Sequence, residues 1–183
     1  TAWGRLGRPF TYEAMLALPD THLFVPRPEA DAIMRLYGNA FGAAFVGLIL
    51  ASEATDEYMM VEYHDTGHVD DGEAGSWDTA ALLAAVGERT TAGNRMRRRL
   101  GGSDVELVGW VAEPTYASRR RALAWSVEVA SDGETGDSAT VKDHGIVLGR
   151  TGYVELTLMT DRSTVERGAS QLPALLAGVR FNR

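Results

Sequence analysis

The residues best suited to chemistry lie in the acidic segment that runs from Glu62 to Asp78. Two imidazoles, His64 and His68, are interspersed there with carboxylates, and both groups are good ligands for divalent metals. A hydrolase or metal-dependent enzyme with its site in this loop, residues 62–78, is therefore one hypothesis for function. The candidate binding residues are three aspartates of the loop and one tryptophan further along the chain: Asp65, Asp70, Asp71 and Trp110.

The spacing within this segment fits no established metal motif. His64 and His68 would share a face only on a helix, and Gly67 and the strand-like pattern before it oppose a helix. A calcium loop would need its ninth and closing ligands at positions that these aspartates do not supply. The other interpretation is a solvated acidic loop at the end of a strand. We adopt it, and assign no catalytic residue, no metal ligand and no cofactor.

Trp110 and Trp125 lie on runs that should be neighbours in a sheet. Aromatic pairs in sheets usually stabilise packing. We expect Trp125 in the core, because it shares its face with Leu123 and Val127. Trp110 shares its face with Val108 in this reading, and it is either a packing residue or a platform for a ligand.

Motifs typical of enzymes are missing from the chain. There is no phosphate-cradling loop, no dinucleotide fingerprint, no zinc-protease motif and no nucleophile elbow. Gly149-Arg150-Thr151-Gly152 resembles the GxxG loop of KH domains, but it lies between two strand-like runs and predicts a tight hairpin instead. These absences favour a protein that is not an enzyme, although a site assembled in space is not visible in sequence.

Four strand-like runs between residues 105 and 159 decide the fold class. Only turns separate them, and parallel strands need crossovers of a dozen or more residues, so the runs must form an antiparallel meander. The first run is ended by Pro114, and in the second Leu123, Trp125 and Val127 alternate with polar residues. The runs are residues 105–113, 122–130, 139–148 and 153–159.

Further strands and three helices complete the pattern. We expect a short hairpin from residues 12–18 and 22–25, and two more strands at 45–51 and 57–64. The helices are expected from Pro28 to Gly38, from a Ser76 cap to Leu100 with an apolar line through Leu82, Val86, Met96 and Leu100, and over 163–177. The prediction is an α+β fold in one domain, residues 1–183, with a mainly antiparallel sheet of six to seven strands and about three packed helices.

The composition limits the partners. The 183 residues include 18 basic and 25 acidic side chains, which give a formal charge of −7 and a pI of about 5.1. Nucleic acid is therefore not an expected partner, because phosphate binding needs a basic surface. Every basic residue except Lys142 is an arginine, which points to a high-GC bacterial genome, and four arginines end the long helix, where they complement its dipole: Arg95, Arg97, Arg98 and Arg99.

Seven segments in order resemble a bacterial family of uncharacterised membrane-anchored proteins, a domain of unknown function. The resemblance runs from about residue 11 to 182 and includes VEYHDTGHVDD (61–71), VELVGWVAEPTY (105–116) and GIVLGRTGYVELTLMTD (145–161). It implies an extracytoplasmic domain, periplasmic or at the cell envelope, carried after a signal peptide and followed by transmembrane helices. The closing order of a helix and then Val179–Phe181 also resembles the Mog1/PsbP-like α/β/α sandwich. Neither resemblance supplies functional residues.

Three hypotheses for function remain open. The first is a non-enzymatic extracytoplasmic binding or accessory domain that contacts a membrane-associated or envelope protein. The second is the enzyme with its site at residues 62–78, and the third is a structural module that makes an oligomer through its sheet. The sequence fixes neither the oligomeric state nor the role of His64 and His68.

Overall fold

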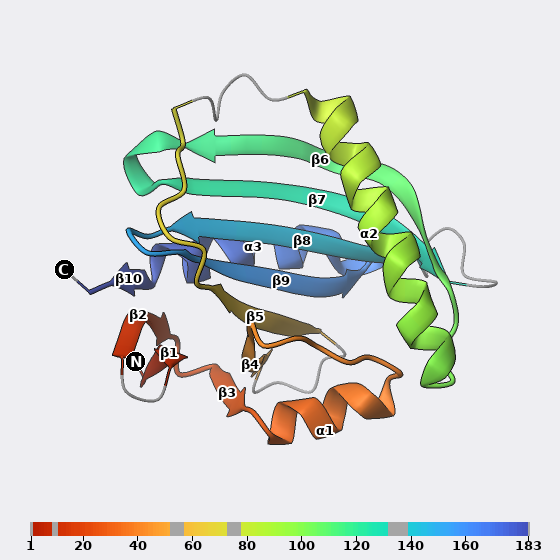
Figure 1. The fold of residues 1–183 in the computed structure, drawn as a ribbon, viewed down its shortest axis with the longest axis horizontal. Helices are drawn as coiled ribbons and strands as arrows, with labels where there is room; N and C mark the ends of the chain where they lie inside the picture. Colours follow the sequence, from red (N-terminus) through yellow and green to blue (C-terminus); the bar gives the residue numbers. More distant parts are fainter. Residues whose placement is uncertain (1, 9–10, 52–56, 73–77, 132–138, 183) are drawn as a thin grey trace.

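The computed structural model describes residues 2–8, 11–51, 57–72, 78–131 and 139–182. Its centre is a seven-stranded sheet in which every pairing is antiparallel (Figure 1). The strands are β3 (His22–Pro26), β4 (Phe45–Ala51), β5 (Tyr58–His64), β6 (Val105–Ala117), β7 (Ala122–Ser131), β8 (Thr140–Leu148) and β9 (Tyr153–Asp161). Their order across the sheet is β3-β4-β5-β9-β8-β7-β6. The predicted antiparallel α+β fold is thereby confirmed.

A second, three-stranded sheet joins the two ends of the chain. It consists of β1 (Ala2–Arg8), β2 (Thr11–Leu18) and β10 (Val179–Phe181). β2 lies in the middle and pairs with both of the others. The first and last described strands are therefore held next to the same segment.

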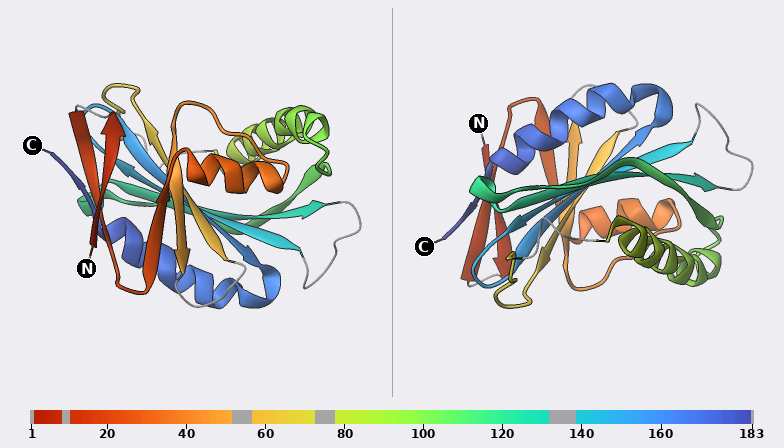
Figure 2. Two further views of the ribbon diagram at one scale, coloured as in Figure 1. Left: turned by 90° about the horizontal axis from the view of Figure 1, so that it is seen from below. Right: turned by 90° about the horizontal axis from the view of Figure 1, so that it is seen from above.

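Three α-helices cover the large sheet from both sides (Figure 2). They are α1 (Glu29–Leu36), α2 (Thr79–Arg99) and α3 (Val165–Ala177), and the described residues also include the 3₁₀ turns η1 (Ser118–Arg120) and η3 (Arg162–Thr164). α3 and the small sheet pack on one face, whereas α1 and α2 lie on the other. The result is an α/β/α sandwich.

The main core lies between α3, β2 and the middle of the large sheet. Alternate residues of β5 and β9 point into it, and Val61, Val154 and Leu156 have no exposed surface. From the other side, Leu172 and Leu175 of α3 close the layer. A smaller core beneath α1 contains Ala30, Met34, Phe45 and Leu48. Burial of apolar side chains at this density is the main stabilising term of the fold.

The expected hairpin of residues 12–18 and 22–25 is wrong. The chain does turn at Pro19, where the His22 N–H donates to the Pro19 carbonyl at 3.0 Å. However, β2 then pairs in the small sheet, whereas β3 pairs with β4 in the large one. Two short runs gain more from joining sheets that bury their apolar faces than from an isolated two-stranded hairpin, which is marginal in water.

The long helix was placed correctly but its details differ. Asp78 caps it, accepting hydrogen bonds from the amides of Ala80 and Ala81 at 2.9 and 3.1 Å, and the expected cap Ser76 lies outside the described residues. Met96 and Leu100 of the predicted apolar line are 43% and 41% exposed, so that line is wrong in its second half. The buried residue of this half is Asn94, which bonds both the amide and the carbonyl of Val105 at 3.0 Å.

The first strand of the meander continues through Pro114 to Ala117, past its predicted end. Proline is tolerated there because β6 is an edge strand and its register shifts between Ala112 and Thr115. A second irregularity, between Leu107 and Gly109, leaves Val108 60% exposed and turns Trp110 to the face beneath α2. The predicted common face of Val108 and Trp110 is therefore wrong.

None of the helices in the described ranges is both long and apolar enough to span a lipid bilayer.

Candidate functional site

The face of the large sheet beneath α2, here called the α2 face, carries a group of polar side chains from β5, β8 and β9. Strand alternation explains this: Met59, Val61 and Tyr63 of β5 point into the main core, so Glu62 and His64 must point to the opposite face. The same rule applied to β9 buries Val154 and Leu156 and leaves Glu155 on the α2 face. α2 itself packs chiefly on β6, which leaves the central strands less covered.

The centre of this face holds the Glu/His cluster, which we define as Glu62, His64, His144 and Glu155. The register of the strands builds it: Glu62 is opposite Glu155 across β5 and β9, and His144 is opposite Thr157 across β8 and β9. His64 Nε2 lies 3.5 Å from Glu155 Oε2 and 3.7 Å from Glu62 Oε2. His144 Nδ1 lies 3.1 Å from Glu155 Oε1, to which it donates a hydrogen bond, and 3.2 Å from Thr157 Oγ1.

The charges of the cluster are set by this arrangement. Burial alone would raise the pKa of Glu155, but the contacts of His144 and His64 with its carboxylate lower that pKa to about 2. For Glu62, burial and then the charge of Glu155 raise the pKa of the carboxyl. The polar contact with Glu155 raises the pKa of His64. Glu155 is therefore the fixed negative charge around which the other three groups are arranged.

Aromatic rings hold both imidazoles in place. The ring of His64 is stacked on Tyr153, with centroids 4.4 Å apart and planes inclined by 14°. The ring of His144 is stacked on Trp125 at 4.9 Å and 6°. Because each imidazole is fixed by a ring on one side and a carboxylate on another, the cluster is preorganised.

Three groups of the cluster have the composition of a metal site. One ligand atom each from Glu62, His64 and Glu155 lies within 4.8 Å of the other two. Tetrahedral zinc with bonds of about 2.1 Å would need neighbouring ligand atoms about 3.4 Å apart, close to the two distances from His64 Nε2. That nitrogen is buried and has no hydrogen-bond partner in the described part of the chain. His144 would then orient Glu155 from behind.

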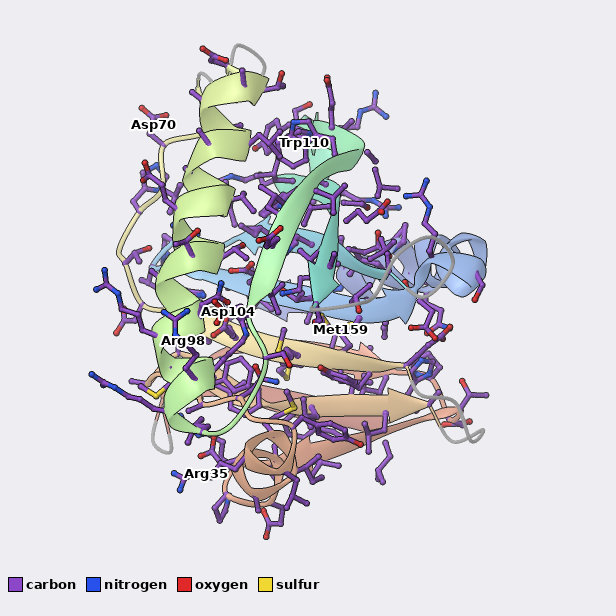
Figure 3. All side chains as sticks on the ribbon, turned by 90° about the vertical axis from the view of Figure 1, so that its right-hand side faces the viewer. Arg35, Asp70, Arg98, Asp104, Trp110 and Met159 are labelled. Carbon is purple, nitrogen blue, oxygen red and sulfur yellow. The ribbon has the colours of Figure 1, made fainter. Side chains whose placement is uncertain are left out.

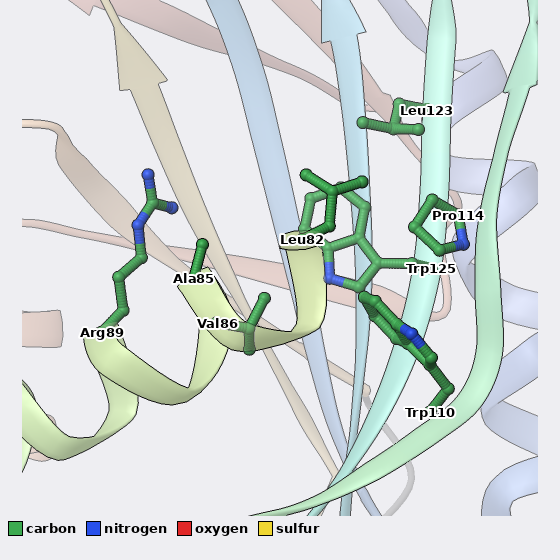
Figure 4. Close-up of a pocket in the computed structure, with 8 residues that line it drawn as sticks. All are labelled: Leu82, Ala85, Val86, Arg89, Trp110, Pro114, Leu123 and Trp125. Atoms are coloured by element: carbon green, nitrogen blue, oxygen red, sulfur yellow. The ribbon is translucent and has the colours of Figure 1, made fainter. Parts of the chain in front are cut away.

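A groove opens between the first half of α2 and strands β6 and β7 (Figure 4). Its volume is about 200 Å³. We call it the aromatic groove, because Trp110 and Trp125 form its floor and one wall, facing Leu82 of the helix. The complete lining is Leu82, Ala85, Val86, Arg89, Trp110, Pro114, Leu123 and Trp125. Trp125 contacts both the groove and His144, so the groove and the Glu/His cluster adjoin each other.

The structure separates the candidates of the acidic loop from this site. Asp71 is clamped by Arg121, whose Nε lies 3.1 Å from Oδ2, and by the hydroxyl of Tyr116. These hydrogen bonds hold the pKa of Asp71 below its usual range. Asp70 accepts from the Gly72 amide at 2.9 Å and stabilises its own turn. Asp70 therefore stabilises the loop itself, and Asp71 fastens the loop to the β6–β7 hairpin.

The remaining candidates divide differently. Asp65 and His68 are exposed in the same loop, and Trp110 lies in the aromatic groove. Trp125, expected in the core, is half-buried and lines the groove as well. Sequence reasoning missed Glu155 and His144 as site residues. The alternation of residues 153–159 predicts that Glu155 lies on the other face of its strand from Val154 and Leu156. However, no feature of the neighbouring sequence shows that β5 pairs with β9.

Comparison with known proteins is informative about fold. No curated protein matches this chain. Cyanobacterial PsbP (CyanoP) from Synechocystis sp. PCC 6803 is similar in structure, with a TM-score of 0.57 and 10% identity over 98% of this chain and 92% of that chain. The Ran-binding protein Mog1p of Saccharomyces cerevisiae has a TM-score of 0.46 and 9% identity, over 98% of this chain and 94% of that one. The likeness to CyanoP confirms the expected PsbP-like fold.

The family assignment rests on sequence. The model of a family described as "Protein of unknown function (DUF2167)" matches residues 9–183, which is nearly the whole chain. The expected membership in a domain family of unknown function is confirmed, and the chain belongs to the DUF2167 family.

Proposed function

We propose that this domain acts by binding: a partner protein inserts an apolar or aromatic side chain into the aromatic groove. The observation that carries the proposal is the pair of tryptophans, Trp110 and Trp125, that meet Leu82 across the groove. Pockets that hold whole small molecules usually measure about 300–1,000 Å³, and this one measures about 200 Å³. Its size therefore suits one anchoring side chain, the arrangement typical of hot spots at protein interfaces.

A charged residue at the rim of the groove indicates which residue of the partner lies next to the inserted side chain. Arg89 is the one charged residue of the lining, and its side chain is exposed. No ion pair joins it to a carboxylate of the described residues, and its charge acts on Tyr153. An acidic group next to the anchor would pair with Arg89. We infer a partner segment with an aromatic or aliphatic residue followed or preceded by Asp or Glu.

The setting of this partner follows from the family resemblance. We propose that the domain is the extracytoplasmic part of a membrane-anchored bacterial protein and that its partner is a membrane-associated or envelope protein. In this role the domain is an accessory module, and the sandwich provides a rigid frame for the groove.

Site-specific photocrosslinking tests the binding role. With a benzophenone side chain at Leu82, which lines the groove, we expect the full-length protein in its native host to form one discrete adduct. Trp110→Ala should weaken that adduct about 30-fold, the effect of losing a 2 kcal/mol hot spot. The matched control is the same probe at Ala84, an exposed residue of the same helix outside the groove. Equal adducts at the two positions, or an adduct indifferent to Trp110→Ala, would contradict the proposal.

A second candidate function is metal binding by the Glu/His cluster. The buried Nε2 of His64, which lies 3.5 and 3.7 Å from two carboxylates without a hydrogen bond, favours it. This differs from a site within the loop 62–78, because Glu155 of β9 completes it. A metal bound there could support catalysis, or it could order the neighbouring aromatic groove.

Thermal unfolding with excess Zn²⁺ tests this second candidate. A ligand at 100 times its Kd stabilises by about 2.7 kcal/mol, so we expect the Tm to rise by about 5 °C or more. His64→Gln should remove that rise, whereas Asp70→Asn, the matched change in the loop, should leave it intact. If zinc produces the same rise in the His64→Gln variant, the metal is not held by the cluster.

A further inference from the structure

The single lysine of the chain occupies an unusual position. Lys142 lies on β8 and points to the α2 face, between Met159 of β9 and Val127 of β7 in the register. No hydrogen bond or ion pair of its ammonium group is found within the described ranges. The other 17 basic residues are arginines, so position 142 is the one place where the chain has a lysine.

A second cation lies next to Lys142. Arg97 of α2 lines the same pocket, and its Nη1 donates to Asn94 Oδ1 at 2.7 Å. Asn94 is itself buried and fixed by two hydrogen bonds to Val105, so the guanidinium is held in place. Asp104, whose charge acts on Arg97, forms its ion pair with Arg98 (Figure 3). No described carboxylate therefore faces Lys142.

The ammonium group of Lys142 is unfavourable where it lies, because its charged neighbour is a second cation, whereas Arg97 has the charge of Asp104 near it. Burial, and then the charge of Arg97, lower the pKa of Lys142 to about 8. Removing a charge from water without a partner costs free energy, and a like charge beside it adds to that cost. Strongly perturbed pKa values are concentrated at functional sites.

The surroundings of the two cations are those of a site for a small anion. They line a pocket of about 190 Å³ beneath the C-terminal half of α2, at the other end of the helix from the aromatic groove. The hydroxyls of Ser103, Ser131 and Thr140 line the same pocket. A guanidinium, an ammonium and several hydroxyls together offer donors on different sides, as a tetrahedral oxyanion requires.

We propose that this pocket binds a phosphate group, with Lys142 and Arg97 as its charged ligands and the hydroxyls as neutral donors. This site is separate from the partner groove and does not depend on it. The phosphate group is either the free ion or part of a phosphomonoester, since both present the same oxygens.

The lone lysine makes the test direct. An amine-reactive acylating reagent can modify only Lys142 and the terminal amine, and peptide mass spectrometry distinguishes the two. At constant ionic strength, saturating inorganic phosphate should slow modification of Lys142 at least tenfold and leave the terminal amine, the internal control, unchanged. Arg97→Gln should reduce that protection. A parallel series with glycerol 3-phosphate distinguishes the ester from the free ion, because the preferred form protects at lower concentration.

Other outcomes overturn the proposal. Equal protection by chloride, or no protection by either phosphate compound, excludes a phosphate site. Protection by acetate alone shows that the pocket takes a carboxylate. If burial makes Lys142 too slow to modify, the Tm decides: phosphate should raise it in the natural protein and not in the Lys142→Met variant, and an equal rise in both would also exclude the site.

Discussion

Replacing Lys142 by Met should raise the free energy of unfolding at pH 7 by about 3 kcal/mol in buffer without phosphate. Methionine keeps the length of the side chain but removes the buried, unpaired charge. The pKa of Lys142 falls from 10.5 to about 8 on folding, and each unit of difference corresponds to about 1.36 kcal/mol. The change should be measured by chemical denaturation of the two proteins side by side.

The stability difference between the natural protein and the Lys142→Met variant should depend on pH in a defined direction. Since the folded-state pKa lies below the unfolded one, the unfolded state binds more protons between about pH 8 and 10.5. The natural protein therefore gains stability from Lys142 as pH rises through that window, and the advantage of the variant should shrink there. Below pH 8 the advantage should be constant. As control, Arg150→Met removes an exposed charge in a turn and should change stability by less than about 0.5 kcal/mol. A destabilised Lys142→Met variant would show that the ammonium has a partner.

The second large effect is expected at Gly152, in the turn between β8 and β9. A Cβ atom at this position would lie 2.1 Å from the carbonyl oxygen of His64. The clash is with backbone, so no rotamer change relieves it, and β9 would have to separate from β5. Gly152→Ala should therefore lower the free energy of unfolding by about 3 kcal/mol, the upper end of what overpacking costs.

Gly109→Ala is the matched control for this change. Gly109 lies on β6, where a Cβ would meet no atom within 4 Å, so we expect a change within about 0.5 kcal/mol. The imidazole resonances of His64 offer a second measurement, because the displaced carbonyl belongs to that residue. If Gly152→Ala matched the control in stability, the close approach of the two strands would be incorrect.

Local pattern was a good guide to the sheet. The alternation of Leu123, Trp125 and Val127 placed them correctly on one face, and the short gaps correctly excluded parallel crossovers. These features depend on neighbours in sequence, for which a period of two is a strong constraint. The GRTG segment likewise forms the hairpin turn that its position predicted, with the Gly149 amide donating to the Gly152 carbonyl at 2.7 Å.

The site was not visible in the same way, because it depends on contacts between distant segments. Glu62 and Glu155 meet only through the pairing of β5 with β9, and Lys142 meets Arg97 only where α2 crosses the sheet. The conspicuous acids of the loop have structural partners instead: Asp70 bonds the Gly72 amide two residues on, and Asp71 bonds Arg121 of the β6–β7 hairpin. Polar residues on an otherwise apolar strand indicate the site better, because a polar side chain that is partly buried in a sheet is unusual and often has a functional role.

The small sheet has a consequence for the order in which this protein can mature on the ribosome. β2 receives its second neighbour only when Val179–Phe181 has been synthesised, and Val179 is itself 5% exposed in the main core. Until residues 179–181 are free to pair, one edge of β2 lacks its hydrogen-bonding partner. The growing chain therefore exposes an unpaired strand edge until β10 is available, which makes it a substrate for chaperones during that interval.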